Sequence, residues 1–228
     1  MTEQEAQDWL AARGWWTGVK GDRLRRFVAL LLDEADRQNL ISQASRTEIW
    51  ARHIVDSAQL PRLAPVADGA EGAWVDLGTG AGLPGIVVAC LIDSPVDLVE
   101  ARPLRTAFLE RCIAELGLDH ARVHTARVER WTPERPARII SARAFAPLDR
   151  MLAVAGHLSD ENTVWLLPKG RQAEKELEML RRDWQALFHV EHSLTDPESS
   201  IVTIQQLRRR KPVSLRPNAG PRTKRRTR

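Results

Sequence analysis

Residues 74–85 read Trp74-Val75-Asp76-Leu77-Gly78-Thr79-Gly80-Ala81-Gly82-Leu83-Pro84-Gly85. A short apolar run is followed here by four glycines within eight residues. Glycine permits a tight backbone turn and a close approach to a ligand. In open α/β sheets, ligands bind at the carboxyl ends of the strands. The stretch therefore predicts a first parallel strand, a ligand-binding turn and the first helix of an α/β sheet.

Short apolar runs and helical stretches alternate after this turn. The helical stretches include residues 104–116 and 148–157, and residues 174–187 are expected to form a further helix. Such alternation predicts a parallel sheet with helices on both faces. Residues 188–192 and 200–207 are expected to close the sheet as a hairpin. The apolar runs begin near Trp74, Val96, Arg122, Arg138 and Thr163.

The first part of the chain has a different pattern. Apolar residues recur at helical spacing in residues 23–37 and 47–60, and Pro61, Pro65 and the stretch 69–72 then break the pattern. We therefore expect an N-terminal helical subdomain over residues 1–66 and a Rossmann-like α/β domain over residues 67–207. Residues 208–228 are expected to be a disordered basic tail.

The charge is unevenly distributed along the 228 residues. The formal net charge is +4, but residues 208–228 hold ten Lys and Arg and no Asp or Glu, which leaves −6 for residues 1–207. A basic tail of this kind either binds nucleic acid or another polyanion, or only keeps the protein solvated. A hydrophobic content of 43% with 28% charged residues is typical of a folded soluble protein.

Several classes of protein are disfavoured by composition. There is no run of 18 apolar residues and the chain begins with a polar, acidic segment, so we expect a cytoplasmic protein without a membrane span. The two cysteines, Cys90 and Cys112, are too few for a disulfide framework or a cysteine-rich zinc site. We expect no bound metal.

The sequence of the glycine-rich turn is compatible with two cofactors. Residues 80–85 match the dinucleotide fingerprint G-x-G-x-x-G, and Glu100 follows 20 residues after Gly80, as a ribose-binding acid does. The spacing of Asp76, Gly78, Gly80 and Gly82 instead resembles motif I of the methyltransferases that use S-adenosylmethionine. A carboxylate at Asp76 suits a methionine ammonium group and would repel a pyrophosphate. Pro84 also lacks an N–H that a pyrophosphate would use. We therefore favour S-adenosylmethionine over a nicotinamide cofactor.

The absence of certain motifs reduces the number of atoms that could accept the methyl group. Enzymes that methylate an exocyclic amino nitrogen typically carry Asn/Asp-Pro-Pro-aromatic after the fourth strand, where this chain has residues 141–147, Ser-Ala-Arg-Ala-Phe-Ala-Pro. Methylation of a pyrimidine C5 needs a Cys nucleophile, and Cys90 and Cys112 both fall inside expected helices. Guanine N7 has a free lone pair and loses no proton, so it needs only alignment. Oxygen and small-molecule acceptors also survive this elimination.

A series of segments resembles one known family, the small-subunit ribosomal RNA methyltransferase G family, also called glucose-inhibited division protein B. The resemblance covers residues 20–207, and the segments keep the family's order and approximate spacing. They are Asn39-Leu40-Ile41-Ser42, His53-Ile54-Val55-Asp56-Ser57, residues 75–85, Phe108-Leu109, Glu115-Leu116-Gly117-Leu118, Arg127-Val128-Glu129, Arg143-Ala144-Phe145-Ala146 and Lys169-Gly170.

This resemblance implies a specific reaction and a set of site residues. The family transfers a methyl group from S-adenosylmethionine to N7 of guanine 527 in the 530 loop of 16S rRNA. The partner would be 16S rRNA or the small ribosomal subunit, and we expect a monomer. No general base is implied, and Arg143 and Lys169 are candidates for positioning the substrate. The candidate cofactor-binding residues are Asp76, Gly78, Gly80, Gly82, Leu83, Glu100, Val128, Glu129 and Arg143.

Other functions and features remain open at this stage. A small-molecule methyltransferase of the same fold is the main alternative, followed by a nicotinamide-dependent oxidoreductase and by a non-catalytic RNA-binding protein. His53 and Asp56 are three residues apart, so they share a helix face and either orient the substrate or hold the helices against the sheet. A basic patch on the N-terminal helices is also expected, made of Arg23, Arg25, Arg26, Arg46 and Arg52.

Overall fold

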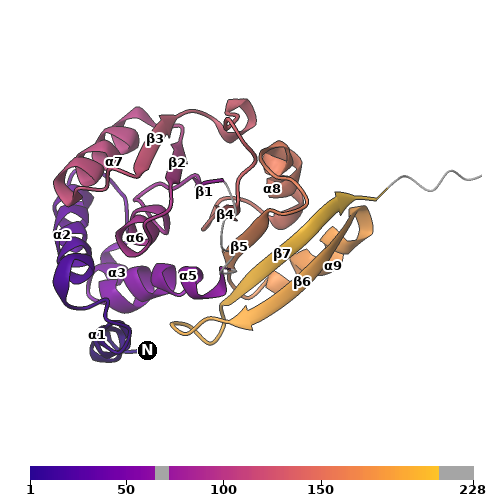
Figure 1. Ribbon diagram of the computed structural model, residues 1–228. Helices are drawn as coiled ribbons and strands as arrows, with labels where there is room; N and C mark the ends of the chain where they lie inside the picture. The colour runs from indigo at the N-terminus through magenta and orange to yellow at the C-terminus, as the bar shows by residue number, and fades with distance from the viewer. Residues whose placement is uncertain (65–71, 211–228) are drawn as a thin grey trace, which may run out of the picture.

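One seven-stranded sheet organises the computed structural model, which describes residues 1–64 and 72–210 (Figure 1). The strand order is β3-β2-β1-β4-β5-β7-β6, and β7 runs antiparallel to both of its neighbours while the other neighbouring pairs are parallel. The order reverses at β1, so the crevice between β1 and β4 is the switch point where such sheets bind ligands. The strands are β1 (Trp74–Leu77), β2 (Val96–Glu100), β3 (Ala121–Thr125), β4 (Ile139–Ser141), β5 (Val164–Lys169), β6 (Trp184–His192) and β7 (Ser200–Arg209).

The predicted parallel strands are confirmed, each beginning within one residue of the expected position. This accuracy reflects the runs of apolar residues in β1, β2, β4 and β5, which are buried on both faces along most of their length, whereas β3 at the edge of the sheet is only partly buried. The sheet is of the Rossmann-like type expected for a class I methyltransferase, with the closing hairpin that the sequence indicated.

Two sets of helices cover the sheet. On one face, α2 (Gly18–Ala35), α6 (Gly85–Leu91) and α7 (Pro103–Leu116) pack together, and α8 (Leu148–Ala155) and α9 (Ala173–Asp183) pack on the other. Two short 3-10 turns, η2 (Val128–Arg130) and η3 (Gly156–Leu158), complete the second layer. No helix in the described ranges is long and apolar enough to cross a membrane.

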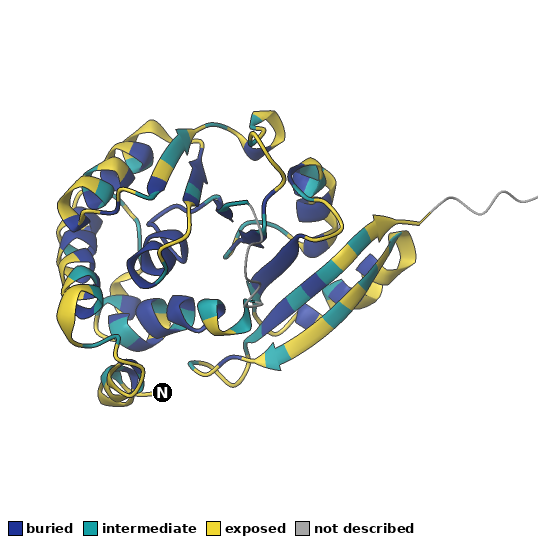
Figure 2. Ribbon diagram, in the orientation of Figure 1, coloured by how far each residue is buried: buried dark blue, intermediate teal, exposed yellow. Residues whose placement is uncertain are grey.

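Strand alternation divides the core into two apolar clusters (Figure 2). In β2, Leu98 faces the first helix layer and Val99 the second, because successive side chains of a strand point to opposite faces. The first cluster continues without interruption into the N-terminal helices through residues such as Phe27, Leu31 and Ile54, which are fully buried. The N-terminal helices are therefore packed directly against the sheet's own helices.

The N-terminal region is helical, as predicted, but more broken than its periodicity indicates. Residues 47–60 were expected to form one helix, whereas the structure has a π-helical turn, η1, followed by two short α-helical segments. The expected subdomain boundary at residue 66 lies outside the described residues. The elements here are α1 (Glu3–Ala11), α3 (Gln43–Arg46), η1 (Trp50–Val55), α4 (Asp56–Ala58) and α5 (Leu60–Leu63).

Two boundaries near the C-terminus were predicted wrongly. The helix expected over residues 174–187 ends at Asp183, because Trp184 and Gln185 pair with the end of β7 and start strand β6. Long-range pairing overrides the local helical spacing there. Strand β7 also continues to Arg209, so the first residues of the expected tail belong to the sheet. Residues 211–228, the rest of that tail, lie outside the described residues.

Gly85 provides a test of how tightly α6 is seated on the sheet. A Cβ at this position would collide with the Leu98 side chain and approach Asp76 Oδ2 to 2.8 Å. We expect Gly85→Ala to lower the free energy of unfolding by about 2 kcal/mol, as overpacking of a filled core does. Gly170→Ala is the control, because a Cβ there meets nothing within 4 Å, and it should change stability by less than about 0.5 kcal/mol. Equal urea-unfolding midpoints for the two variants would contradict this account.

Candidate active site

The glycine-rich turn folds back over the carboxyl ends of β1 and β2. Gly78, Gly80 and Gly82 have φ values of 63°, 58° and 82°, in the left-handed region that favours glycine. The Gly78 N–H donates to Val99 O at 2.8 Å, and Thr79 O accepts from the N–H groups of Gly82 and Leu83. These backbone hydrogen bonds hold the turn together with two side chains, because Glu100 accepts from the Gly80 N–H and Asp76 accepts from the Gly85 N–H.

A buried chain of hydrogen bonds lies beneath this turn. Trp74 Nε1 donates to Ser141 Oγ at 2.8 Å, and Ser141 Oγ donates to Asp76 Oδ1 at 2.7 Å. The Gly85 N–H donates to the other carboxylate oxygen, Asp76 Oδ2, at 2.9 Å. Asp76 thereby connects β1 to β4 and to the first residue of α6.

The Asp76 carboxylate, for which the sequence predicts a contact with a methionine ammonium group, is fully buried. Burial raises the pKa of Asp76 to about 6, and the hydrogen bonds from Ser141 and Gly85 oppose that rise. Both of its oxygens have protein donors, so the structure places it behind the turn.

Glu100 ends β2 directly beside the turn. Its Oε2 accepts from the Gly80 N–H at 3.1 Å, and its Oε1 accepts from the N–H groups of Ala101 and Arg102. Arg105 Nη1 lies 3.7 Å from the carboxylate. A carboxylate has about four acceptor positions, so Glu100 retains capacity for a hydroxyl donor. Glu100 is itself buried beside the glycine-rich turn, in which only Gly78 is partly exposed, and its remaining acceptor positions are compatible with the ribose hydroxyl groups of S-adenosylmethionine.

The other predicted cofactor residues occupy the same edge of the sheet. Val128 and Glu129 form the turn η2 after β3, and Glu100 O accepts from the nearby Ala126 N–H at 3.0 Å. Val128 is buried and Glu129 is exposed, which gives this turn an apolar and a polar residue side by side. Leu83 is only 4% exposed and packs into the core under the turn.

The segment after β4 connects the turn to a cavity. Ala144 has a φ of 51°, an uncommon value for a residue other than glycine. The Phe145 ring lies against Gly78: a Cβ on Gly78 would be 2.6 Å from Phe145 Cδ2. Nothing local in the sequence marks Phe145 as a site residue, because local pattern does not indicate which glycine its ring contacts.

Arg143 points from the same segment toward the N-terminal helices. Its Nη1 lies 3.2 Å from His53 Nδ1 and 3.3 Å from Asp56 Oδ2. Burial, together with the Arg143 charge, lowers the pKa of His53 to about 4, so His53 is neutral at pH 7. Neutral His53 accepts from Arg143 through Nδ1 and donates through Nε2 to Ser45 Oγ at 3.0 Å. The structure thus unites Arg143 with the pair predicted to share a helix face.

Asp56 also holds the loop that joins β6 and β7. Its Oδ1 accepts from Thr195 Oγ1 at 3.0 Å and from Gln59 Nε2 at 3.2 Å. Gln59 in turn donates to Ser193 Oγ and accepts from the Leu194 N–H. Figure 1 shows this loop beside α5. The contacts of Asp56 and Gln59 with the loop join residues more than 130 positions apart, so the periodicity of the sequence does not indicate them.

Lys169 ends β5 and is largely buried, with 13% of its side chain exposed. Its Nζ donates to Ala146 O at 2.7 Å and pairs with Glu176 of α9 at 3.0 Å. Glu176 also accepts from the Leu148 N–H. Lys169 therefore anchors the C-terminal side of the segment that carries Phe145, directly at Ala146 and through Glu176 at Leu148.

Two cavities meet at Arg143. The first, of about 460 Å³, is lined by residues 143–147, by the end of β5 and by the start of β7. We term it the target cavity. The second, of about 780 Å³, lies between the segment 40–56 and the β6–β7 loop. Asp56, Arg143 and Ser199 line both cavities, so they form one continuous depression.

The expected basic patch is not a group of free cations. Arg25, Arg26, Arg46 and Arg52 each pair with a carboxylate, on Asp22, Glu115, Asp36 and Glu48 respectively. Arg23 instead donates to the carbonyl groups of Leu116 and Gly117 at the end of α7. Sequence spacing placed these residues on nearby helices but did not show the acids opposite them.

The cysteines have no exposed thiol. Cys90 and Cys112 are buried in α6 and α7, and burial raises the pKa of each to about 12. Neither is a nucleophile at neutral pH, because the thiolate is the reactive form. Within residues 1–64 and 72–210 there is no cluster of three or more His, Cys, Asp or Glu side chains arranged to hold a metal.

Comparison with known sequences gives a consistent result. Residues 20–202 match the family described as rRNA small subunit methyltransferase G. A protein named ribosomal RNA small subunit methyltransferase G from Sphingopyxis alaskensis is 51% identical over 202 residues, covering 86% of this chain and 85% of that protein. One of the same name from Novosphingobium aromaticivorans is 46% identical over 214 residues, covering 93% and 92%.

Solved structures of low sequence identity share the fold. The glycopeptide N-methyltransferase MtfA in complex with S-adenosyl-L-methionine superposes with a TM-score of 0.54 at 9% identity, covering 68% of this chain and 94% of that one. A DhpI complex with SAH has a TM-score of 0.51 at 18% identity, covering 78% and 94%. At this identity the likeness concerns the fold alone.

The raised pKa of Asp76 leads to a pH-dependent prediction. The folded state holds the Asp76 proton more tightly than the unfolded state, so folding loses this contribution as the pH rises from about 4 to about 6. Asp76→Asn does not ionise, and it should gain stability relative to the wild type over that interval, by up to about 3 kcal/mol, with no further change above it. Urea unfolding at pH 4, 5, 6 and 7 measures the difference. A stability difference that is constant with pH would contradict the prediction.

Proposed function

The chain belongs to the rRNA small subunit methyltransferase G family and uses S-adenosylmethionine to methylate rRNA of the small subunit, and we propose that its target atom is N7 of guanine 527 in the 530 loop of 16S rRNA. Family membership excludes the alternative of a nicotinamide-dependent oxidoreductase. It also favours rRNA over the small-molecule acceptor that the sequence left open. A cytoplasmic location, a monomeric state and the absence of a metal remain predictions.

The observation that carries the choice of N7 is the chemistry of the target cavity. Among the described residues that line it there is no His or Cys, and its two carboxylates are already paired, Asp56 with Arg143 and Glu176 with Lys169. The cavity therefore offers no unpaired general base. Guanine N7 needs none, because its lone pair attacks and no proton leaves.

The proposed cofactor site lies at the carboxyl ends of β1, β2 and β3. When bound, S-adenosylmethionine supplies an electrophilic methyl group on its sulfonium. We propose that Glu100 accepts from the ribose hydroxyls and that Val128 and Glu129 flank the adenine. Gly78, Gly80 and Gly82 allow the backbone to approach the cofactor, and Leu83 fixes the turn from below. Asp76 contributes by holding this turn in place.

The paired charges in the target cavity are also compatible with the positive charge of an N7-methylated guanine. Methylation at N7 gives the purine ring a positive charge, which an unpaired cation nearby would disfavour. Arg143 and Lys169 are each balanced by a carboxylate 3.3 Å and 3.0 Å away, so the four charged groups of the target cavity sum to zero. We propose that Arg143 and Lys169 position the substrate, with Phe145 between the cofactor turn and the target base.

The direct test is methyl transfer from labelled S-adenosylmethionine to small subunits that lack methylation in the 530 loop. We expect one modified guanine, mapped at position 527 by strand cleavage specific for N7-methylguanine. Deproteinised 16S rRNA is tested in parallel, to separate recognition of RNA from recognition of the subunit. Transfer to another base or to an exocyclic nitrogen would contradict the proposal, and so would the absence of transfer to both substrates.

Gly78 provides a test of the cofactor turn. In Gly78→Asp the new side chain meets the Phe145 ring and adds a negative charge, so we expect S-adenosylmethionine to stop raising the melting temperature and methyl transfer to be lost. RNA binding should persist. Gly14→Asp is the matched control, because Gly14 has a φ of 68° and open space around it. Normal turnover in Gly78→Asp would contradict the proposed cofactor site.

A further inference from the structure

The second cavity, which we term the backbone cleft, leads directly into the target cavity. One side is formed by residues of the segment 40–56, and the other by Arg171 and residues 195–199 of the β6–β7 loop. A cleft of about 780 Å³ next to a target-base cavity has the size of a site for more than one nucleotide. On the proposed function, the strand that carries the target guanine has to pass through it.

Two exposed guanidinium groups stand on opposite sides of this cleft. Arg52 belongs to η1 and pairs with Glu48, one helical turn before it, and Arg171 precedes α9 and pairs with Glu198 of the loop. The side chains of Arg52 and Arg171 are 62% and 76% exposed, and their partners are 53% exposed. Such exposed ion pairs exchange readily, and an Arg fork matches the oxygens of a phosphate.

Acidic groups slightly outnumber basic ones in the cleft. Arg52, Arg143 and Arg171 face Glu48, Asp56, Asp196 and Glu198. Asp56 is occupied by Arg143 and the loop hydroxyls, and Asp196 accepts from the Glu198 N–H and from Ser199 Oγ. Glu48 and Glu198 are the two acids whose side chains hold the exposed arginines.

We propose that Arg52 and Arg171 bind phosphates of the RNA backbone on either side of the target nucleotide, displacing Glu48 and Glu198. This inference rests on the proposed function. The two glutamates then act as internal competitors: they hold the arginines in position in the free protein and weaken binding to RNA that does not fill the cleft. Removing an arginine and removing its glutamate should therefore change RNA affinity in opposite directions.

The experiment measures equilibrium binding of the full chain to unmethylated small subunits and to deproteinised 16S rRNA, over a series of salt concentrations. Each phosphate contact with single-stranded RNA contributes about 0.7 to the slope of log affinity against log salt, which is about fivefold in affinity at 0.1 M salt. We expect Arg52→Ala and Arg171→Ala each to lose that slope and affinity. Glu48→Gln and Glu198→Gln should bind RNA more tightly than the wild type.

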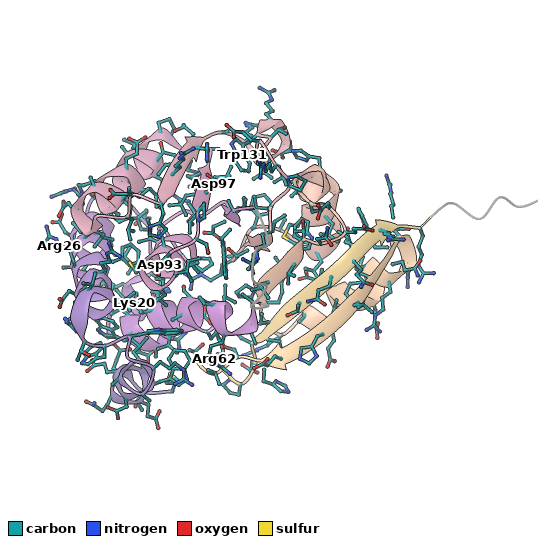
Figure 3. The ribbon with its side chains drawn as sticks, viewed as in Figure 1. Lys20, Arg26, Arg62, Asp93, Asp97 and Trp131 are labelled. Atoms are coloured by element: carbon teal, nitrogen blue, oxygen red, sulfur yellow. The ribbon has the colours of Figure 1, made fainter. Side chains whose placement is uncertain are left out.

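Arg26→Ala is the matched control, because Arg26 is also an exposed arginine paired with a glutamate, Glu115. Figure 3 labels it on the outer side of α2, across the molecule from the β6–β7 hairpin. It should leave RNA affinity unchanged. An equal loss in Arg26→Ala, or unchanged or weaker binding in the two Gln variants, would overturn the proposal, since a structural role for the arginines does not predict tighter binding.

Failure of this inference is distinguishable from failure of the proposed function. If RNA bound with the expected dependence on Arg52 and Arg171 but guanine 527 were not methylated, the backbone cleft would stand and the target atom would be wrong. If guanine 527 were methylated while Arg52→Ala and Arg171→Ala bound RNA as the wild type does, the target would stand and the cleft assignment would be wrong. The rise in melting temperature with S-adenosylmethionine confirms in each variant that the cofactor site is intact.

Discussion

The buried carboxylate of Asp76 is the constraint on which the rest of the site depends. It accepts one hydrogen bond from Ser141 of β4 and one from the backbone of Gly85 at the start of α6. A buried polar group without such partners costs more free energy than a hydrogen bond returns, so the two donors must be present together. The position of β4 beside β1, the entry of α6 and the curvature of the turn between them are thereby linked. The cofactor turn is shaped by a side chain that lies behind it.

A second junction joins the helical part of the chain to the catalytic edge. The Asp56 carboxylate accepts hydrogen bonds from Arg143, in the segment after β4, and from Thr195, in the β6–β7 loop. Neutral His53 accepts a hydrogen bond from the same Arg143. The N-terminal segment therefore forms one wall of the backbone cleft and contributes Asp56 to the target cavity, and residues of the closing hairpin line both. On the proposed function the substrate would contact all three parts of the chain, whereas the glycine-rich turn follows β1 and is held by the end of β2.

Pairing of charges explains how a body with a formal charge of −6 serves an RNA substrate. The exposed arginines of the N-terminal helices are balanced by nearby acids, so they do not produce a broad field that attracts any polyanion. Arg143 and Lys169, which line the target cavity, are balanced in the same way. On the proposed exchange of ion pairs, affinity for RNA would depend on phosphates that replace internal carboxylates at particular positions. Such exchange favours specific over indiscriminate binding.

The sequence by itself determined the order of strands and helices, the glycine-rich turn and the family. These features are local: buried strands show as apolar runs, and a turn that needs left-handed backbone shows as glycines at 78, 80 and 82. It also placed Glu100 at the carboxyl end of β2 and Arg143 just after β4, because charged residues that follow an apolar run are recognisable by position. Only the tertiary structure decided that Asp76 is fully buried, that Trp184 begins a strand and that Arg143 meets His53 and Asp56. Those outcomes depend on strand register and on contacts between distant segments, which no local periodicity encodes.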